Sequence, residues 1–467
     1  MAETGLGFDT LMNDPSGRIA AAMAAGRDFL SETATSGLLG KVGAAIDVVP
    51  AAQYPDKRWF QKSYGRGVTD APEDLLVGKG LFYLTEQRQL FLDCTAGHYQ
   101  MTWGYEQPDL TALLLDGIQR GIVWDDHSNI PSAPVKQLAA KLIELANPGA
   151  DLAALQQDDE RLNTVLTGCA TGSVACAAGM KIQLLYYEQN KSSHGAPVFV
   201  TLDGNYHGSD VFGQYLRGMW PQYFANVEVV MVQPNDGDEL EGVFAQYGER
   251  IAGFWAEPVM MNREAILLQP WYLQLARRLC DETGALMAID EIQSCFWFPE
   301  LFIFHRFAIE PDLLVLGKGM TAGFHPLAAL VYRGKLDILE QYDAISTNGN
   351  AALPAYLALG NIALIKREAQ GIARAGEHYH DKMVELAEQF PRLLAEARGV
   401  AHMTGLKFHR VDDALAFHRA AVASGLWVRV HAYHAGHSTI LSKFALPLSE
   451  PVADYATERF AELLGGL

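Results

Sequence analysis

A lysine between two glycines follows a buried-looking apolar run and is the first candidate for chemistry. Leu313 to Leu316 leads into Gly317-Lys318-Gly319, so the lysine is expected at the end of a strand, where open α/β sheets bind ligands. A lysine amine can form a Schiff base with a carbonyl compound. The same tripeptide occurs at Gly78-Lys79-Gly80 without a partner motif. A solvated lysine in a turn is therefore the alternative for Lys318.

An acidic motif follows a second apolar run. Leu286 to Ile289 is followed by Asp290-Glu291-Ile292-Gln293. Asp290 and Lys318 lie 28 residues apart, a separation that suits one crossover between neighbouring parallel strands. We therefore expect the two side chains to share a pocket. The alternative is a strand that ends in solvent, or an aspartate that caps a helix.

Two more strand ends could hold the rest of a flat, anionic ligand. The Gly-, Thr- and Ser-rich loop 167–173 opens a helix expected over 175–187, and backbone N–H groups at a helix N-terminus bind phosphate. Tyr206 follows the run 198–202 and could cover the face of a ring. Each also has a purely structural interpretation. Together, however, an amine, a carboxylate, a phosphate cup and an aromatic lid are what pyridoxal 5′-phosphate (PLP) requires.

The order and spacing of these motifs resemble the class III aminotransferases, a family of fold type I PLP-dependent enzymes. The resemblance extends from about residue 45 to the end of the chain. The motifs that carry it are Leu92-Asp93 through Gly97, Thr171-Gly172-Ser173 with Lys181, Tyr206-His207-Gly208, Glu257-Pro258-Val259, Asp290-Glu291-Ile292-Gln293, Gly317-Lys318-Gly319-Met320-Thr321 and Gly349-Asn350.

The resemblance implies a role for each matching residue. Lys318 would form the Schiff base, and Asp290 would face the pyridine nitrogen. Gln293 would contact the ring oxygen and Tyr206 would stack on the ring. The phosphate would be held by Thr171, Gly172 and Ser173, and by Ser346 or Thr347 from a neighbouring subunit. A homodimer with sites at its interface is therefore expected.

The substrate side departs from the family pattern. Lys443 stands where many members carry the arginine that binds a substrate carboxylate, and a lysine lacks the bidentate guanidinium. Further departures are Val174, Ser209, Met260-Met261-Asn262 and Phe298-Pro299. The candidates for substrate binding are Tyr99, Trp103, Trp124, Trp297 and Lys443. For each aromatic residue, ordinary core packing is the alternative.

Alternating helical segments and short apolar runs between about 132 and 330 predict an α/β fold. Its central sheet should be mostly parallel, with helices on both faces. Helical spacing over 353–367 and 378–398, with short strands near 427–430 and 439–441, predicts a smaller α+β domain. The expected parts are an N-terminal arm (1–40), a segment of the small domain (41–130), the large PLP-binding domain (131–350) and the C-terminal small domain (351–467).

Composition narrows the class of protein. The chain has 467 residues and a formal net charge of −19, so its acidic surface disfavours binding to nucleic acid or to a membrane surface. Five cysteines without a CxxC pair indicate reduced thiols. No secretory signal and no long apolar stretch is visible. We expect a cytoplasmic enzyme that acts on small amines and keto acids.

Three functions fit the sequence. The first is transamination through a Lys318 Schiff base, which moves an amino group between an amine and a keto acid or aldehyde. The second is racemisation or epimerisation of an amino acid on the same cofactor. The third is a PLP-binding protein without catalysis. Incubating one enantiomer in deuterated water without a keto acid would separate the first two, because only a racemase would return inverted, labelled amino acid.

Overall fold

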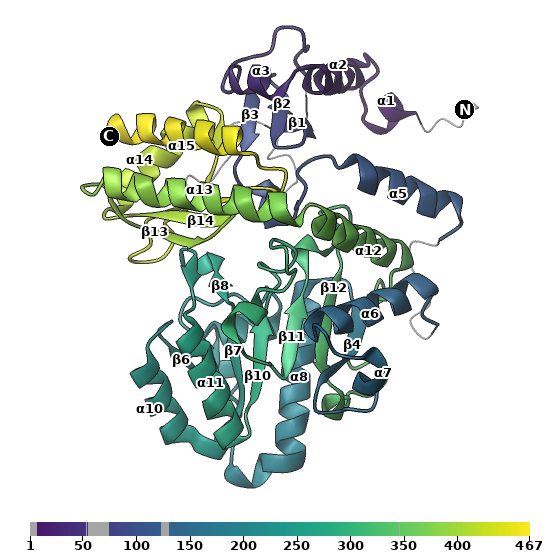
Figure 1. Ribbon diagram of the computed structural model, residues 1–467, viewed down its shortest axis with the longest axis vertical. Helices are drawn as coiled ribbons and strands as arrows, with labels where there is room; N and C mark the ends of the chain where they lie inside the picture. The colour runs from purple at the N-terminus through teal and green to yellow at the C-terminus, as the bar shows by residue number, and fades with distance from the viewer. Residues whose placement is uncertain (1–6, 53, 55–73, 123–129, 345) are drawn as a thin grey trace. The chain divides into compact units, whose positions relative to one another are not determined.

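The computed structural model describes residues 7–52, 54, 74–122, 130–344 and 346–467 (Figure 1). The chain divides into two compact units, here called unit 1 (Met1–Gln107 with Arg374–Leu467) and unit 2 (Pro108–Ala373). The boundaries expected from the sequence, after residues 130 and 350, differ from these, because helices α5 (Pro108–Gln119) and α12 (Ala352–Arg367) pack against each other within unit 2.

Unit 2 is built on a seven-stranded sheet in the order β4-β12-β11-β10-β7-β5-β6. Its strands are β4 (Leu162–Cys169), β5 (Val198–Leu202), β6 (Glu228–Val232), β7 (Ile251–Ala256), β10 (Leu286–Asp290), β11 (Leu313–Leu316) and β12 (Ala328–Arg333). Only β12 runs antiparallel to its neighbours, β11 and β4. The remaining pairs are parallel, and this confirms the predicted α/β fold with a mostly parallel sheet.

Helices cover both faces of this sheet (Figure 1). Consecutive strand residues point to opposite faces, so Phe254 and Trp255 identify the two sides. Gly179 on α8 (Gly172–Lys191) lies against Trp255, whereas Phe244 on α10 (Gly237–Tyr247) contacts Phe254. The other helices of unit 2 are α6 (Ala133–Ala146), α7 (Leu152–Leu155), α9 (Val211–Leu216) and α11 (Pro270–Thr283). Short elements complete it: β8 (Val259–Met260), β9 (Ile266–Leu267), η1 (Ser192–His194), η2 (Pro221–Tyr223), η3 (Gly248–Arg250), η4 (Met261–Arg263), η5 (Ile303–Phe307), η6 (Lys318–Thr321) and η7 (Gly334–Leu336).

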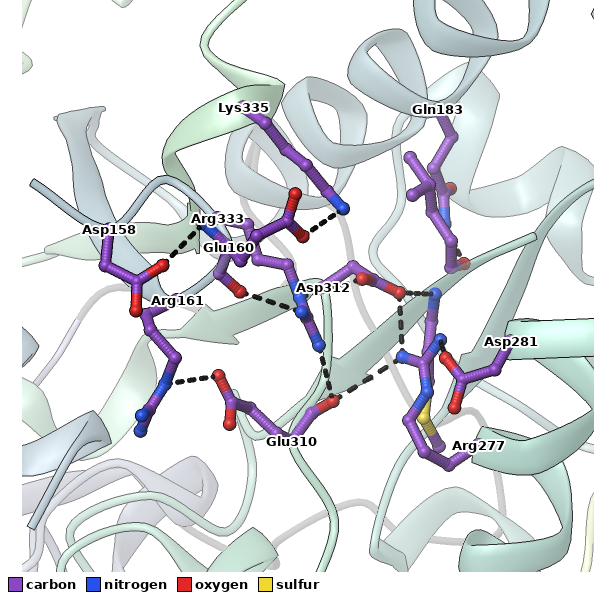
Figure 2. Close-up of polar contacts among 12 residues, drawn as sticks. Asp158, Glu160, Arg161, Gln183, Arg277, Asp281, Glu310, Asp312, Arg333 and Lys335 are labelled. Carbon is purple, nitrogen blue, oxygen red and sulfur yellow. Dashed lines mark hydrogen bonds and ion pairs between the residues drawn. The ribbon is translucent and has the colours of Figure 1, made fainter. Parts of the chain in front are cut away.

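An ionic network fixes the amino-terminal ends of β10 and β11 (Figure 2). Its centre is Asp312, which is buried and directly precedes β11. The carboxylate accepts the backbone N–H of Met287 and the guanidinium of Arg277, each at 2.7 Å, and pairs with Arg333 at 2.9 Å. Because Lys318 follows the other end of β11, the network holds the register of the strands that carry the candidate site.

Unit 1 contains two four-stranded sheets. One has the order β13-β14-β17-β16 and is antiparallel throughout: β13 (Leu394–Val400), β14 (Met403–Phe408), β16 (Arg429–His431) and β17 (Thr439–Lys443). The other is β1 (Leu75–Lys79), β2 (Phe82–Thr85), β3 (Leu90–Asp93) and β15 (Leu426–Trp427), in which β3 and β15 are parallel. Its helices are α1 (Phe8–Leu11), α2 (Arg18–Glu32), α3 (Thr35–Leu39), α4 (Ala96–Tyr99), α14 (Val411–Ala423) and α15 (Glu450–Gly465).

The helix predicted over 378–398 is wrong in its extent. Helix α13 (Ala369–Gln389) ends well before Arg398, and residues 394–400 form strand β13. Phe390-Pro391 follows the helix directly, and a residue before proline is driven out of helical geometry. In the described part of the chain, no helix combines the length and apolar character needed to cross a bilayer. All five cysteines are buried free thiols.

Candidate active site

Asp290 and Lys318 lie at the carboxyl ends of two neighbouring strands. Asp290 is the last residue of β10 and pairs in register with Val315 on the parallel strand β11. Lys318 follows β11 after Gly317 and has a backbone φ of 35°, which is unusual for a residue other than glycine. The aspartate is buried and the lysine is partly exposed. The structure therefore brings together the two residues that sequence spacing predicts to share a pocket.

Three donors hold the Asp290 carboxylate. His207 Nδ1 lies 2.8 Å from Oδ2, the backbone N–H of Ile292 donates to Oδ1 at 2.9 Å, and the Cys176 thiol approaches Oδ2 at 3.5 Å. Burial and the nearby Asp290 raise the pKa of the Cys176 thiol well above its ordinary value, so the thiol stays protonated and can donate. The second ring nitrogen of His207, Nε2, is buried without a hydrogen-bond partner in the described part of the chain.

The glycine-rich loop meets the start of α8 as predicted. Thr171 is the N-cap and Gly172 the first helical residue of this 20-residue helix. A Cβ on Gly172 would lie 2.6 Å from the Ile292 side chain, and one on Gly208 would lie 2.5 Å from the Ser173 hydroxyl. Neither glycine has room for a side chain. The first N–H groups of a helix have no partner within the helix, so this N-terminus can bind an anion.

The segment that follows β12 returns to this loop. The Ser346 hydroxyl donates to the carbonyl of Gly168 and accepts the N–H of Ala170, both at 3.0 Å. Thr347 is exposed. Of the two residues expected to reach a neighbouring subunit, Ser346 is thus bonded within its own chain, and Thr347 presents its side chain to solvent.

Glu257 and Gln293 are buried and hydrogen-bonded to each other, and Glu257 also bonds the backbone of the partly exposed Tyr206. The backbone N–H of Tyr206 donates to Glu257 Oε1 at 2.7 Å, and Gln293 Nε2 donates to Oε2 at 3.2 Å. Burial raises the pKa of Glu257 to about 7, and the nearby imidazole of His207 acts in the opposite direction. The guanidinium of Arg217 lies 5.2 Å from the centre of the Tyr206 ring. Tyr206, which follows β5, and Gln293, which follows β10, thus lie at the same edge of the sheet as Asp290.

Glu291 has a structural role that sequence reasoning missed. Its carboxylate accepts the backbone N–H groups of Ile303 at 2.9 Å and Phe304 at 2.7 Å, and the Ser294 hydroxyl at 3.2 Å. Burial raises its pKa to about 7. Glu291 therefore caps the helical turn η5 and points away from the group around Asp290, although the two residues are adjacent in sequence.

Three substrate-binding candidates belong to unit 1, where they are buried. Lys443 on β17 is fully buried, and its Nζ donates to the carbonyl of Tyr99 at 3.2 Å and lies 5.6 Å from the centre of the Tyr99 ring. Tyr99 has a positive φ of 65° and Trp103 is 5% exposed. The Tyr99 hydroxyl is buried without a partner within the described ranges. Trp297 belongs to the core of unit 2, and Trp124 lies outside the described residues.

Arg429 on β16 is a candidate that sequence reasoning missed. Its guanidinium lies 5.2 Å from the centre of the Tyr99 ring, donates to His98 Nδ1 at 2.9 Å and hydrogen-bonds Tyr433. Arg429 is partly exposed and His98 is exposed. In a chain of net charge −19, an arginine set among aromatic and imidazole groups is the type of group that binds a carboxylate. Its position two residues beyond Trp427 gives no local signal of this environment.

The residues around Asp290 suit PLP. A carboxylate oriented by three neighbouring groups can pair with a protonated pyridine nitrogen, and the glycine-lined start of α8 can hold a phosphate. Lys318 supplies an amine after the neighbouring strand β11, and Tyr206 and Gln293 follow β5 and β10 at the same edge of the sheet. When bound, PLP forms imines with amines and withdraws electrons from the adjacent carbon.

Comparisons with known proteins identify the family of this chain. Residues 66–464 match the family model of the class-III aminotransferases. The acetylornithine aminotransferase of Xylella fastidiosa is 27% identical over 341 residues, which cover 71% of this chain and 78% of that protein. The ornithine aminotransferase of Toxoplasma gondii superimposes with a TM-score of 0.73 at 20% identity, covering 88% of this chain and 93% of that one.

A third relative supports the same fold. An amine transaminase from an uncultivated Pseudomonas species, solved in its PLP-bound form, gives a TM-score of 0.72 at 19% identity, with 88% of this chain and 99% of that one covered. The family predicted from the motifs is confirmed, and with it the reaction and the cofactor. The chain belongs to the class III aminotransferases and is a PLP-dependent transaminase.

Proposed function

We propose that Lys318 is the residue that carries transamination in this enzyme and that Asp290 is its partner at the cofactor ring. The observation that supports this most strongly is the register of β10 and β11, which places both residues at one edge of the sheet. The glycine-lined start of α8 supports the assignment of Thr171, Gly172 and Ser173 to the phosphate.

The proposed chemistry assigns a task to each side chain. When PLP is bound, Lys318 Nζ would be the base that accepts the proton from the substrate carbon bearing the amino group. Asp290, bonded to His207, the Ile292 N–H and Cys176, would hold the ring nitrogen. Tyr206 would stack on the ring, and Gln293 would contact the ring oxygen. The cofactor would supply the imine chemistry that moves the amino group from an amine to a keto acid.

The substrates are amines or amino acids and keto acids or aldehydes. A keto acid needs a cation for its carboxylate, and the partly exposed Arg429 is our candidate in unit 1. Lys443 is fully buried and bonded to the Tyr99 carbonyl, so we propose that it holds Tyr99 in place. Tyr99 and Trp103 remain our candidates for contact with the substrate.

The assembly and compartment are also part of the proposal. We expect a cytoplasmic homodimer in which Thr347, which is exposed, or Ser346 reaches the phosphate bound by the other subunit. Mixing two inactive variants, one lacking Lys318 and one lacking the Thr347 side chain, would test this. Partial recovery of activity in the mixed dimers is the expected result.

The central assignment has a matched control within the chain. Lys318→Ala should abolish turnover, the absorbance band of the Schiff base and the covalent adduct trapped by borohydride. Lys79→Ala changes a lysine in the same tripeptide, whose Nζ donates to the Ser31 hydroxyl at 3.0 Å, and should keep all three. A borohydride adduct that survives in the Lys318→Ala protein would overturn the assignment.

A further inference from the structure

One buried carboxylate connects two of the residues proposed to contact the cofactor ring. Glu257 directly follows β7 and is 2% exposed. Its Oε1 accepts the backbone N–H of Tyr206, and its Oε2 accepts the side-chain amide of Gln293. These partners come from the segments that follow β5 and β10, the two strands on either side of β7 in the sheet. Both carboxylate oxygens are therefore used, each by a different segment.

The chemistry of the carboxylate determines how the Gln293 amide is turned. An ionised carboxylate can only accept hydrogen bonds, whereas a glutamine amide has a donor end and an acceptor end. Above its pKa of about 7 Glu257 is ionised, and the amide must then present its NH₂ group to Oε2, because the opposite orientation would place a carbonyl oxygen against a negative charge. The other charged groups that face Glu257 are His207 and Asp290, and they are already bonded to each other.

We propose that Glu257 is a positioning residue that fixes the amide orientation of Gln293 and tethers the backbone of Tyr206. The proposal rests on the proposed role of Gln293 at the ring oxygen of PLP. An NH₂ group carries two hydrogens, so an amide held in this orientation is a donor, and not an acceptor, toward a group on the same side. A negatively charged ring oxygen is such an acceptor, and an amide turned the other way would offer it a carbonyl instead.

This orientation has a measurable consequence. A hydrogen bond donated to the ring oxygen withdraws negative charge from the neighbourhood of the Schiff-base nitrogen, so the nitrogen holds its proton less tightly. Losing that donor should raise the pKa of the Schiff base. Because the loss of one hydrogen bond to a charged group is involved, we expect an increase of about one pH unit.

The test is a double-mutant cycle read by spectroscopic titration between pH 7 and pH 10. Glu257→Gln is isosteric: its carbonyl oxygen can still accept the Tyr206 N–H, but its NH₂ group then faces Gln293 and turns the amide over. Gln293→Leu removes the amide altogether. The absorbance of the Schiff base gives its pKa in the wild type, in each single variant and in the double variant. Chemical unfolding of the same four proteins reports their stability.

The expected result is a rise of the Schiff-base pKa in both single variants and no further rise in the double variant, since Glu257 acts through Gln293. A Glu257→Gln protein that is less stable but keeps the wild-type pKa would show a purely structural role and overturn the proposal. An additive shift in the double variant would also overturn it. A wild-type protein that forms no Schiff base with PLP would instead refute the assignment of Lys318.

Discussion

The imidazole of His207 hydrogen-bonds the carboxylate of Asp290 at 2.8 Å, and both side chains are buried. Trp255 packs against the imidazole, with 5.0 Å between the ring centres. The imidazole is therefore held between the indole ring and the carboxylate, and it orients the carboxylate that we propose to face the cofactor nitrogen.

Removing the imidazole should weaken cofactor binding. A hydrogen bond to a charged group contributes about 1.5–3 kcal/mol, so His207→Ala should lower PLP affinity by about 10- to 100-fold. His207→Asn is the matched control, because its amide NH₂ can replace the Nδ1 donor and should preserve most of the affinity. Equilibrium binding of PLP to the apoenzyme, followed by absorbance, measures both. Equal affinity in the alanine variant and the wild type would contradict the prediction.

The network of Figure 2 predicts a large effect on stability away from the site. Asp312→Asn leaves the guanidinium of Arg277, with a side chain 14% exposed, without its buried negative partner. Breaking a buried pair in this way costs about 3 kcal/mol or more. Asp281→Asn removes an exposed partner of the same arginine and should cost about 0.5 kcal/mol or less. Urea unfolding measures the difference. Similar losses in the two variants would show that the buried pair adds little stability.

Stability should depend on pH through Glu291. Its pKa is raised from 4.5 to about 7 by burial, so the folded state binds the proton more tightly than the unfolded state does. The resulting contribution of Glu291 to the free energy of unfolding is complete below pH 4.5 and is lost as the pH rises through 7. Between pH 5 and pH 8 the wild type should lose up to about 3 kcal/mol more unfolding free energy than Glu291→Gln.

The control for that measurement is Glu282→Gln, which changes a carboxylate with a side chain 55% exposed. It should reproduce the wild-type pH dependence. If Glu291→Gln showed the same slope as the wild type, the buried carboxyl group would not be the source of the effect.

Arg429 should determine the affinity for keto acids. Arg429→Ala should raise the KM for a keto acid at least about tenfold, because a charged hydrogen-bond donor to the carboxylate is lost. The half-reaction with an amine that lacks a carboxylate should be unchanged. Arg410→Ala, an exposed arginine of unit 1, serves as the control. If the KM increased in Lys443→Met but not in Arg429→Ala, Lys443 and not Arg429 would be the residue that binds the carboxylate of the keto acid.

The sequence predicts those parts of the site that depend on strand ends. Asp290, Lys318 and the glycine loop each follow an apolar run, and parallel strands bring their carboxyl ends to one edge. The partners of these residues could not be predicted in this way. The contact between His207 and Asp290 joins residues 83 positions apart, and nothing local to either residue indicates the angle at which two loops meet.

Unit 1 shows the same limit more strongly. The sequence marks Tyr99 and Lys443 as substrate residues, but the buried bond from Lys443 to the Tyr99 carbonyl spans 344 positions. The bond from Arg429 to His98 spans 331 positions. Such contacts depend on how β16 and β17 pair and on the positive φ angles of Ala96, Gly97 and Tyr99. Asp290 and Glu291 are a third case. The two carboxylates are adjacent in sequence, but Asp290 bonds His207, whereas Glu291 bonds the backbone of Ile303 and Phe304.

The parallel pairing of β3 with β15 joins Leu92 and Asp93 to Leu426 and Trp427. During synthesis, the ribosome must add more than 300 residues before the first of these strands meets its partner, whereas unit 2 is one uninterrupted stretch. Unit 2 can therefore fold first, while β3 is still unpaired with β15 and accessible to chaperones and proteases. A chain that ended soon after Ala373 would lack β15, so β3 could never form this pairing.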